Sequence, residues 1–149
     1  MKRFLLFIAT LSVAGCLNTG APADASSNPA TETFAASLHV DISKMTKTAN
    51  GVYYSDTKVG TGATLTGVPR VSVTYTGYLK DGSTFAPRDS TVFDLSTLIF
   101  GMQDGMQGMR EGGERVLVIP SALGYGPNGQ GLIPPNSTLV FDVVLSHIG

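Results

Sequence analysis

Apolar and polar positions alternate most clearly in two segments of the chain, residues 71–76 and 139–146. Alternation with a period of two residues is typical of a strand that is buried on one face and polar on the other. The apolar members of these two segments are Val71, Val73, Tyr75, Leu139, Phe141, Val143 and Leu145. We therefore expect two half-buried strands, one in the middle of the chain and one near its C-terminal end.

Weaker signals add further elements. Residues 51–54, 93–95 and 114–119 predict three more strands. Asp81-Gly82 is a favoured dipeptide for the turn of a hairpin, and it directly follows the strand at residues 71–76. These segments favour a mainly antiparallel sheet.

One helix is expected over residues 98–109, with Ser96 or Thr97 as its N-cap. Gly101, Gly105 and Gly108 weaken it, because each glycine costs about 1 kcal/mol relative to alanine within a helix. Only packing against a sheet would hold such a helix. The predicted fold class is α+β, an antiparallel twisted sheet wrapped around one short helix.

The first residues have the pattern of an export signal. Met1-Lys2-Arg3 is basic, and residues 4–13 are apolar but too short to span a bilayer as a helix. Small residues before Cys16 resemble the lipobox of bacterial lipoproteins. We predict a signal peptide over residues 1–15 and lipidation of Cys16; the alternative is an ordinary secretory signal with a chance cysteine.

The next segment is rich in Ala, Ser, Asn, Thr, Gly and Pro, which predicts a flexible tether over residues 17–33. Residues 34–45 carry a weak apolar pattern. They either dock on the domain as an extended arm or continue the tether. We assign residues 16–47 to the lipidated cysteine, tether and arm, and residues 48–149 to the folded domain.

Charge and composition exclude several classes of function. The formal net charge is −1 and the chain has no basic stripe, so we expect no nucleic-acid partner. The single cysteine excludes an internal disulfide. Residues 124–129 fit the pattern G-x-G-x-x-G, but a proline pair follows where a dinucleotide site needs a helix. His39 and His147 have no partner at metal-ligand spacing. We expect no cofactor, no metal and a monomer.

Three separated motifs carry a resemblance to a known family. They are VSVTYTGYLKDGSTF at residues 71–85, GMQDGMQGMREG at residues 101–112, and GGERVLVIP, LGYG and IPPNSTLVFDV within residues 112–143. The chain from about residue 51 to residue 148 thereby resembles the FKBP-type peptidyl-prolyl cis-trans isomerases, in a bacterial lipoprotein form.

The resemblance implies an apolar pocket for a proline-containing peptide. The backbone N–H of Ile99 and the hydroxyl of Tyr125 would donate hydrogen bonds to that peptide. The residues implied to be catalytic are Tyr75, Phe85, Ile99, Tyr125 and Phe141. Those implied to bind substrate are Phe93 in the aromatic wall, Leu98 along one side, Met102 at the floor and Ile133 at the rim.

Some positions depart from the family's pattern. The family has an aspartate directly after the phenylalanine of the hairpin, where this chain has Ala86. It has a tryptophan at the pocket floor, where this chain has Met102. The loops 85–93 and 125–133 also look slightly short. These departures predict weaker catalysis.

The implied activity is isomerisation of X–Pro bonds, and it would assist the folding of exported proteins. The partners would be proline-containing peptides or unfolded exported proteins, with the membrane reached through a lipid anchor at Cys16. We expect a location in the cell envelope, on the periplasmic face of the outer membrane in a Gram-negative cell. The alternative is a peptide-binding or protein-binding module, or a chaperone, with the same fold and little or no turnover.

Overall fold

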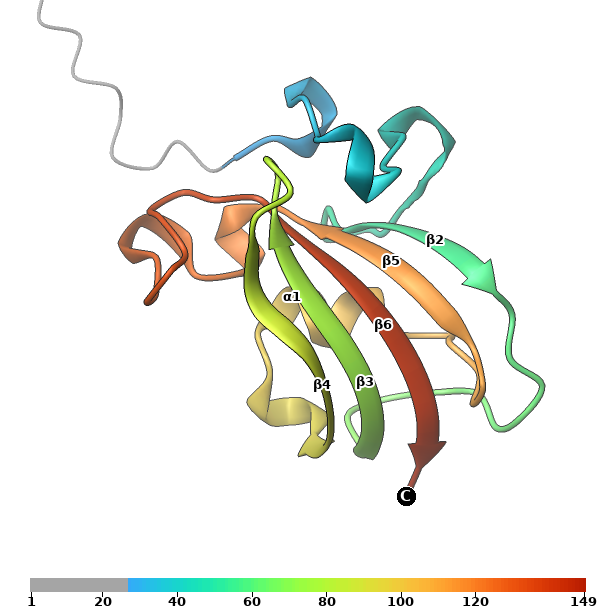
Figure 1. The fold of residues 1–149 in the computed structure, drawn as a ribbon. Helices are drawn as coiled ribbons and strands as arrows, with labels where there is room; N and C mark the ends of the chain where they lie inside the picture. Colours follow the sequence, from blue (N-terminus) through green and yellow to red (C-terminus); the bar gives the residue numbers. More distant parts are fainter. Residues whose placement is uncertain (1–26) are drawn as a thin grey trace, which may run out of the picture.

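The computed structural model describes residues 27–149, so Cys16 and the predicted signal peptide lie outside the described residues. The described chain forms a six-stranded antiparallel sheet with the order β1-β2-β5-β6-β3-β4 (Figure 1). The strands are β1 (Thr46–Lys47), β2 (Tyr53–Lys58), β3 (Arg70–Leu79), β4 (Thr84–Asp94), β5 (Glu114–Ile119) and β6 (Leu139–Ile148).

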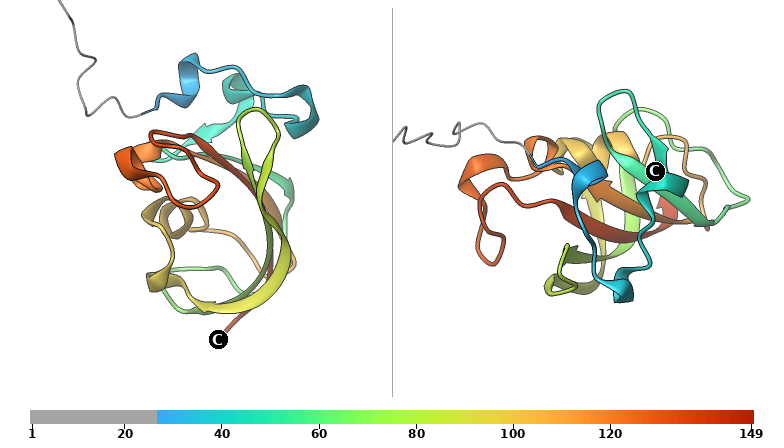
Figure 2. Two further views of the ribbon diagram at one scale, coloured as in Figure 1. Left: turned by 60° about the vertical axis from the view of Figure 1, so that its left-hand side comes forward. Right: turned by 90° about the horizontal axis from the view of Figure 1, so that it is seen from above.

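The sheet curls around one short helix, α1 (Phe100–Gly105), which lies against its inner face (Figure 2). A Cβ atom on Gly101 would lie 2.2 Å from Cγ2 of Ile119, and one on Gly105 would lie 2.8 Å from Cδ2 of Leu117. Both glycines therefore let the helix approach β5 more closely than any other residue would allow. The predicted fold class is confirmed, and packing on the sheet supports the weak helix.

The helix is shorter than the predicted range of residues 98–109. Gly108 has a φ of +76°, a left-handed conformation that ends the helical region. The predicted caps are also wrong, because Ser96 and Thr97 belong to the 3₁₀ turn η4 (Leu95–Thr97) and make no N-cap bond to α1.

The predicted short strand at residues 93–95 and the predicted loop at residues 85–93 are wrong. Residues 84–94 form the single strand β4, which pairs with β3 along its length. Tyr75 pairs with Asp89 whereas Gly77 pairs with Ala86, so β4 carries one extra residue at this point. Such a bulge bends a strand and increases its twist, which suits a sheet that curls.

The main core lies between the inner face and α1. Its buried members on β5 and β6 occupy alternate positions, as the sequence predicts for the last strand. They are Leu117, Ile119, Leu139, Phe141, Val143 and Leu145, with Met102 and Met106 from the helix side.

Arg115 is a charged residue within this inner layer, and its side chain is only 5% exposed. Its Nε and Nη2 atoms donate to the two carboxylate oxygens of Asp56 over 2.6 and 3.0 Å. Its Nη1 atom donates to the carbonyls of Gly105 and Gln107 over 2.8 and 2.9 Å. The guanidinium also lies over the ring of Tyr54. Arg115 thereby ties the end of α1 to β2 and β5.

Residues 27–45, which we call the N-terminal arm, pack against the outer face of the sheet. They form three short 3₁₀ turns, η1 (Pro29–Thr31), η2 (Ala36–Leu38) and η3 (Ile42–Lys44). Apolar arm residues cover the buried side chains of Tyr53, Val118 and Val140; these arm residues are Phe34, Leu38, Val40, Ile42 and Met45. Of the two alternatives for residues 34–45, the docked arm is the one observed. It docks as turns rather than as an extended strand.

Residues 27–33, which the sequence assigned to the tether, contact the domain as well. The Ser27 amide donates to Oγ of Ser121, and the Ser121 amide donates to Oγ of Ser27, over 2.9 and 2.7 Å. The predicted boundaries at residues 15/16 and 47/48 stay predictions. Between residues 27 and 149, no helix has the length and apolar character needed to cross a bilayer.

Candidate active site

Four aromatic side chains from β3, β4 and β6 meet on the inner face, and we call them the aromatic cluster. The ring centroid of Tyr75 lies 5.9 Å from that of Phe93 and 6.3 Å from that of Phe141. The ring of Phe85 meets Phe141 edge-on at 5.4 Å. These separations and tilts are favourable for aromatic pairs. Phe141 is buried and the other three are partly buried, so the cluster is a contiguous apolar surface with access to solvent.

Gly77 makes room for this cluster. A Cβ atom at this position would lie 2.6 Å from the ring of Phe85 and 3.0 Å from the ring of Phe141. Any side chain on residue 77 would therefore push these two rings apart. The glycine of the hairpin motif thus has a packing role at the predicted site.

The segment before α1 contributes Leu98 and Ile99 to the same apolar layer, and α1 itself contributes Met102. The Gln103 side chain donates to the carbonyls of Leu98 and Ser96 over 2.7 and 3.3 Å, which fixes the path of this segment. Within the described residues the amide of Ile99 has no hydrogen-bond acceptor. It is available as a donor, as its predicted role requires. Sequence reasoning missed Gln103, which looked like an ordinary polar helix residue.

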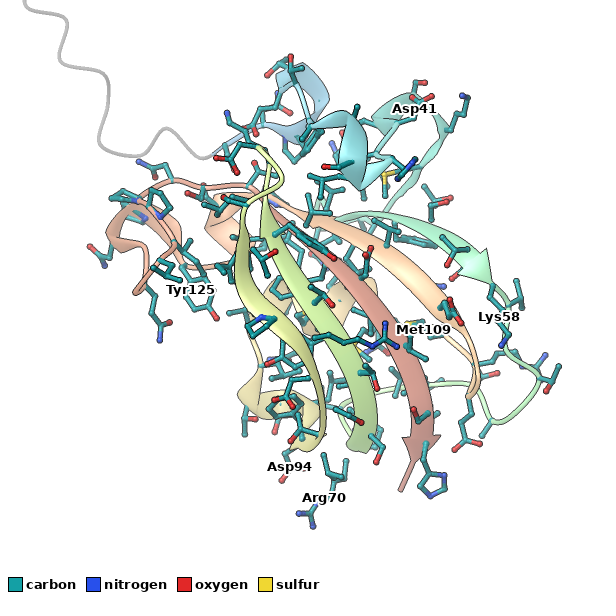
Figure 3. The ribbon with its side chains drawn as sticks, in the orientation of Figure 1. Asp41, Lys58, Arg70, Asp94, Met109 and Tyr125 are labelled. Carbon is teal, nitrogen blue, oxygen red and sulfur yellow. The ribbon has the colours of Figure 1, made fainter. Side chains whose placement is uncertain are left out.

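Tyr125 and Ile133 lie on the long loop between β5 and β6, which contains η5 (Ser121–Leu123) and η6 (Gly126–Asn128) (Figure 3). Reciprocal backbone bonds between Gln130 and Ile133 close the tip of this loop. Ile133 is buried, and Tyr125 is partly buried against the main core. In the described part of the chain the Tyr125 hydroxyl makes no hydrogen bond. It is a second available donor.

A carboxylate also lies beside the cluster, although Ala86 occupies the position where the family has its aspartate. Asp89 is the cross-strand partner of Tyr75, and directly paired residues share a face of the sheet. Burial chiefly raises the pKa of the Tyr75 hydroxyl, and the nearby Asp89 charge adds to this rise. Asp89 lies four positions before Phe93, and residues at alternate positions of a strand share a face. This spacing was the sequence signal that could have identified Asp89.

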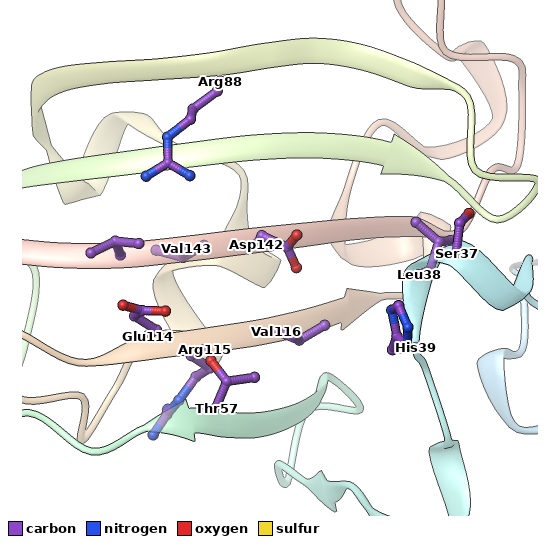
Figure 4. A pocket seen from close by; sticks show the side chains of 11 residues that line it. Ser37, Leu38, His39, Thr57, Arg88, Glu114, Arg115, Val116, Asp142 and Val143 are labelled. Carbon is purple, nitrogen blue, oxygen red and sulfur yellow. The ribbon is translucent and has the colours of Figure 1, made fainter.

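A hollow of about 380 Å³ lies on the outer face, and it involves none of the predicted pocket residues (Figure 4). Asp142 stands between Arg88 on β4 and His39 on the arm. Burial raises the pKa of the Asp142 carboxyl, and the charges of Arg88 and His39 oppose that rise. With both signs of charge on its walls, this hollow is a poor match for an apolar peptide.

All nine predicted pocket residues thus belong to one apolar layer, while their individual roles stay predictions. The arrangement combines aromatic surface, two available donors and a nearby carboxylate. Among residues 27–149, no three histidine, cysteine, aspartate or glutamate side chains are grouped so that they could hold a metal ion.

Comparisons with known proteins agree with this arrangement. The family model described as FKBP-type peptidyl-prolyl cis-trans isomerase matches residues 62–146. Peptidyl-prolyl cis-trans isomerase Mip of Chlamydia muridarum is 44% identical over 100 residues, which cover 64% of this chain and 40% of that protein. The probable FKBP-type peptidyl-prolyl cis-trans isomerase FkpA of Neisseria meningitidis is 45% identical over 107 residues, which cover 68% and 39%.

A solved structure gives the same result. The crystal structure of a peptidyl-prolyl cis-trans isomerase from Pseudomonas syringae pv. tomato is 34% identical, with a TM-score of 0.66, over 70% of this chain and 80% of that chain. The chain spans about two fifths of the length of the two curated relatives. Because the matched region covers more than half of the sequence and the fold agrees, this chain belongs to the FKBP-type peptidyl-prolyl cis-trans isomerase family.

Proposed function

We propose that this protein is a peptidyl-prolyl cis-trans isomerase, with the aromatic cluster as the wall of its substrate pocket. The observation that carries the proposal is the partly open ring surface of Tyr75, Phe85, Phe93 and Phe141, beside two donors without an internal acceptor. These donors are the Ile99 amide and the Tyr125 hydroxyl. Such a surface suits an apolar ring flanked by peptide carbonyls, which is the chemistry of an X–Pro segment.

The reaction requires rotation about one amide bond and no bond cleavage. The barrier is about 18–20 kcal/mol, and an unassisted X–Pro bond isomerises in about tens to hundreds of seconds. In the twisted transition state the amide loses resonance, so its carbonyl is less polarised than in the planar ground state. An apolar wall disfavours the strongly dipolar planar form, and donors placed for the twisted form add to the preference. Only this difference in binding accelerates the reaction, by tenfold for about each 1.36 kcal/mol.

The residues have distinct roles in this scheme. The aromatic cluster and Ile133 exclude water from the prolyl ring, and Met102 forms the floor. The Ile99 amide orients the substrate carbonyl, while the Tyr125 hydroxyl donates to the peptide near the rotating bond. Asp89 supplies negative charge beside Tyr75 and takes the place of the carboxylate absent at Ala86.

The cellular setting is also part of the proposal. The lipobox-like sequence before Cys16 supports a lipid anchor, and two or three acyl chains give stable anchoring. We infer a monomer in the cell envelope, on the periplasmic face of an outer membrane where one exists, that acts on exported proteins as they fold.

The test is the isomerisation rate of a short prolyl peptide with the full chain in detergent. Tyr125→Phe removes only a hydroxyl and should lower kcat/KM by about three- to tenfold, the range expected for one hydrogen bond. Asp89→Asn should lower it as well. Tyr78→Phe, on the outer face, is the matched control and should leave the rate unchanged.

Three results would count against parts of this proposal. Peptide binding without any acceleration by the parent protein would favour the binding module. Equal rates for the parent and Tyr125→Phe would remove the hydroxyl from the mechanism. If Ala86→Asp raises the rate while Asp89→Asn does not lower it, Asp89 is not the substitute carboxylate.

A further inference from the structure

The N-terminal arm contacts each of the three segments that lead into the predicted pocket. Ser27 exchanges two hydrogen bonds with Ser121, four positions before Tyr125. Glu32 accepts a hydrogen bond from Thr138, three positions before Phe141. The amide of Ala35 donates to the carbonyl of Lys80 in the β3–β4 hairpin over 2.8 Å. The arm therefore joins segments that are far apart in the sequence.

Glu32 is the central member of these contacts. Its Oε1 atom accepts from Oγ1 of Thr138 over 3.1 Å, and its Oε2 atom lies 3.6 Å from Nζ of Lys80. The Glu32 side chain is only 14% exposed, whereas Lys80 is 54% exposed. One carboxylate on the arm thus links the hairpin to the segment before β6.

These two segments have an open space between them. A groove of about 290 Å³ is lined by Leu79, Lys80 and Asp81 on one side and by residues 134–138 on the other. The ladder between β3 and β6 ends at the pair Leu79 and Leu139, so beyond that pair neither strand pairing nor packing across the groove sets the distance between its walls. The contacts of Glu32 with both walls supply that restraint.

The hairpin itself rests on the arm. A Cβ atom at Gly82, which has a φ of +88°, would lie 3.0 Å from Oγ of Ser37 and 3.2 Å from Cβ of Ala35. Pro29 is buried nearer the N-terminal end of the arm. The arm is therefore packed against the domain on both sides of Glu32.

We propose that the N-terminal arm is a positioning element of the substrate pocket and that Glu32 is its main positioning residue. By fixing the hairpin relative to residues 134–138, Glu32 holds Phe85 and Ile133 at the separation that a bound peptide needs. This role rests on the proposed isomerase function, because the restrained residues are those assigned to the pocket. Glu32 acts through its neighbours and does not touch the substrate.

The experiment compares Glu32→Ala with Asp41→Asn in the full chain. Asp41 is the matched control, since its carboxylate lies on the same arm and, among residues 27–149, makes its hydrogen bonds and ion pair with Ser43 and Lys44 (Figure 3). For a short prolyl peptide, Glu32→Ala should raise KM about three- to tenfold, as expected for losing one or two polar contacts, while kcat changes by less than about twofold. Asp41→Asn should change neither constant.

Amide hydrogen exchange gives a second readout that does not depend on turnover. Exchange across residues 121–138 should become faster in Glu32→Ala and stay unchanged in Asp41→Asn. Unchanged KM and unchanged exchange in Glu32→Ala would overturn the positioning role. If the parent itself lacks isomerase activity, the proposed function fails, whereas the exchange result still decides whether the arm restrains the loop.

If Glu32→Ala does not fold, a second variant tests the same role. Thr138→Val exchanges a hydroxyl for a methyl group of similar size and removes the hydrogen bond to Glu32. It should reproduce the faster exchange and raise KM by about two- to threefold. Normal values for both quantities in this variant would also overturn the proposal.

Discussion

The inner and outer faces of the sheet are closed in different ways. The inner face packs against α1 and carries the aromatic cluster. The outer face has its buried apolar patch where the arm covers Tyr53, Val118 and Val140, and beyond that patch polar and charged side chains such as Arg88 and Asp142 lie beside Val144. In β5 the consecutive apolar residues 116–119 therefore face two covered sides. A continuous apolar run in a strand is typical of burial on both faces, and here it marks the strip beneath the arm.

Two ion pairs between β2 and β5 differ most clearly in their exposure to solvent. Arg115 and Asp56 pair within the inner layer, where the arginine is 5% exposed. Lys58 and Glu114 pair with a separation of 4.0 Å and are 63% and 45% exposed. Asp56 and Lys58 would share one face in a regular strand, but the bulge between them places Lys58 opposite Glu114 and Asp56 opposite Arg115. One ion pair therefore lies in the inner layer and the other is exposed to solvent.

The largest expected effect is the loss of the inner pair. Arg115→Met should lower the free energy of unfolding by about 3 kcal/mol, because it leaves Asp56 and two carbonyls without their partner. Lys58→Met should change it by less than about 1 kcal/mol, as is usual for an exposed ion pair. Urea unfolding of both variants measures the difference. Equal losses would mean that the two faces do not differ electrostatically.

A matched pair of valines in β6 tests the coverage of the two faces. Val140 on the outer face and Val143 on the inner face are each 1% exposed. Replacing either by alanine should cost about 2 kcal/mol in the whole chain, because two buried methyl groups are lost. After deletion of residues 1–45, Val140→Ala should cost much less, whereas the cost of Val143→Ala should stay the same.

If Val140→Ala lowers the free energy of unfolding as much without the arm as with it, the arm does not account for the burial of the outer face. That result would mean that something other than the arm buries the outer patch. Thermal or urea unfolding of four variants, namely each valine substitution with and without residues 1–45, measures these costs. Each variant is compared with the parent chain of the same length.

The smallest effect concerns the open end of the sheet, near the C-terminus. Glu111 accepts from the amide of Ile148, and this bond chiefly lowers the pKa of its carboxyl below the ordinary value of 4.5. Its stabilising contribution is complete above that ordinary value and is lost as the pH falls through the lower, folded pKa. The difference in the free energy of unfolding between the parent and Glu111→Gln should therefore become smaller as the pH falls below 4.5. A constant difference at every pH would contradict this account.

The sequence predicted the inner face better than the outer one. Alternation placed Val71, Val73 and Tyr75 on one side correctly, and the nine residues that the family resemblance predicts for the pocket all belong to one apolar layer. Asp89 was missed although it follows the period-two spacing from Phe93, because the sequence alone does not show that residues 84–94 form one continuous strand. The helix end was also missed, since Gly108 adopts a left-handed conformation that composition alone does not specify.

The docking of the arm was undecided for a related reason. Five scattered apolar side chains do not say which surface they will meet, and that surface is assembled from β2, β5 and β6. Only the folded sheet brings Tyr53, Val118 and Val140 together. The prediction therefore fell short where burial depends on segments distant in sequence.

The place where the chain enters the domain has a mechanical consequence. Ser27 is bonded to Ser121 at one end of the molecule, while β6 ends at the opposite end (Figure 1). Tension applied to the N-terminal end is therefore carried first by the loop bearing Tyr125, before any strand of the sheet is loaded. A chain pulled from that side would strain the loop bearing Tyr125 before it strained the sheet.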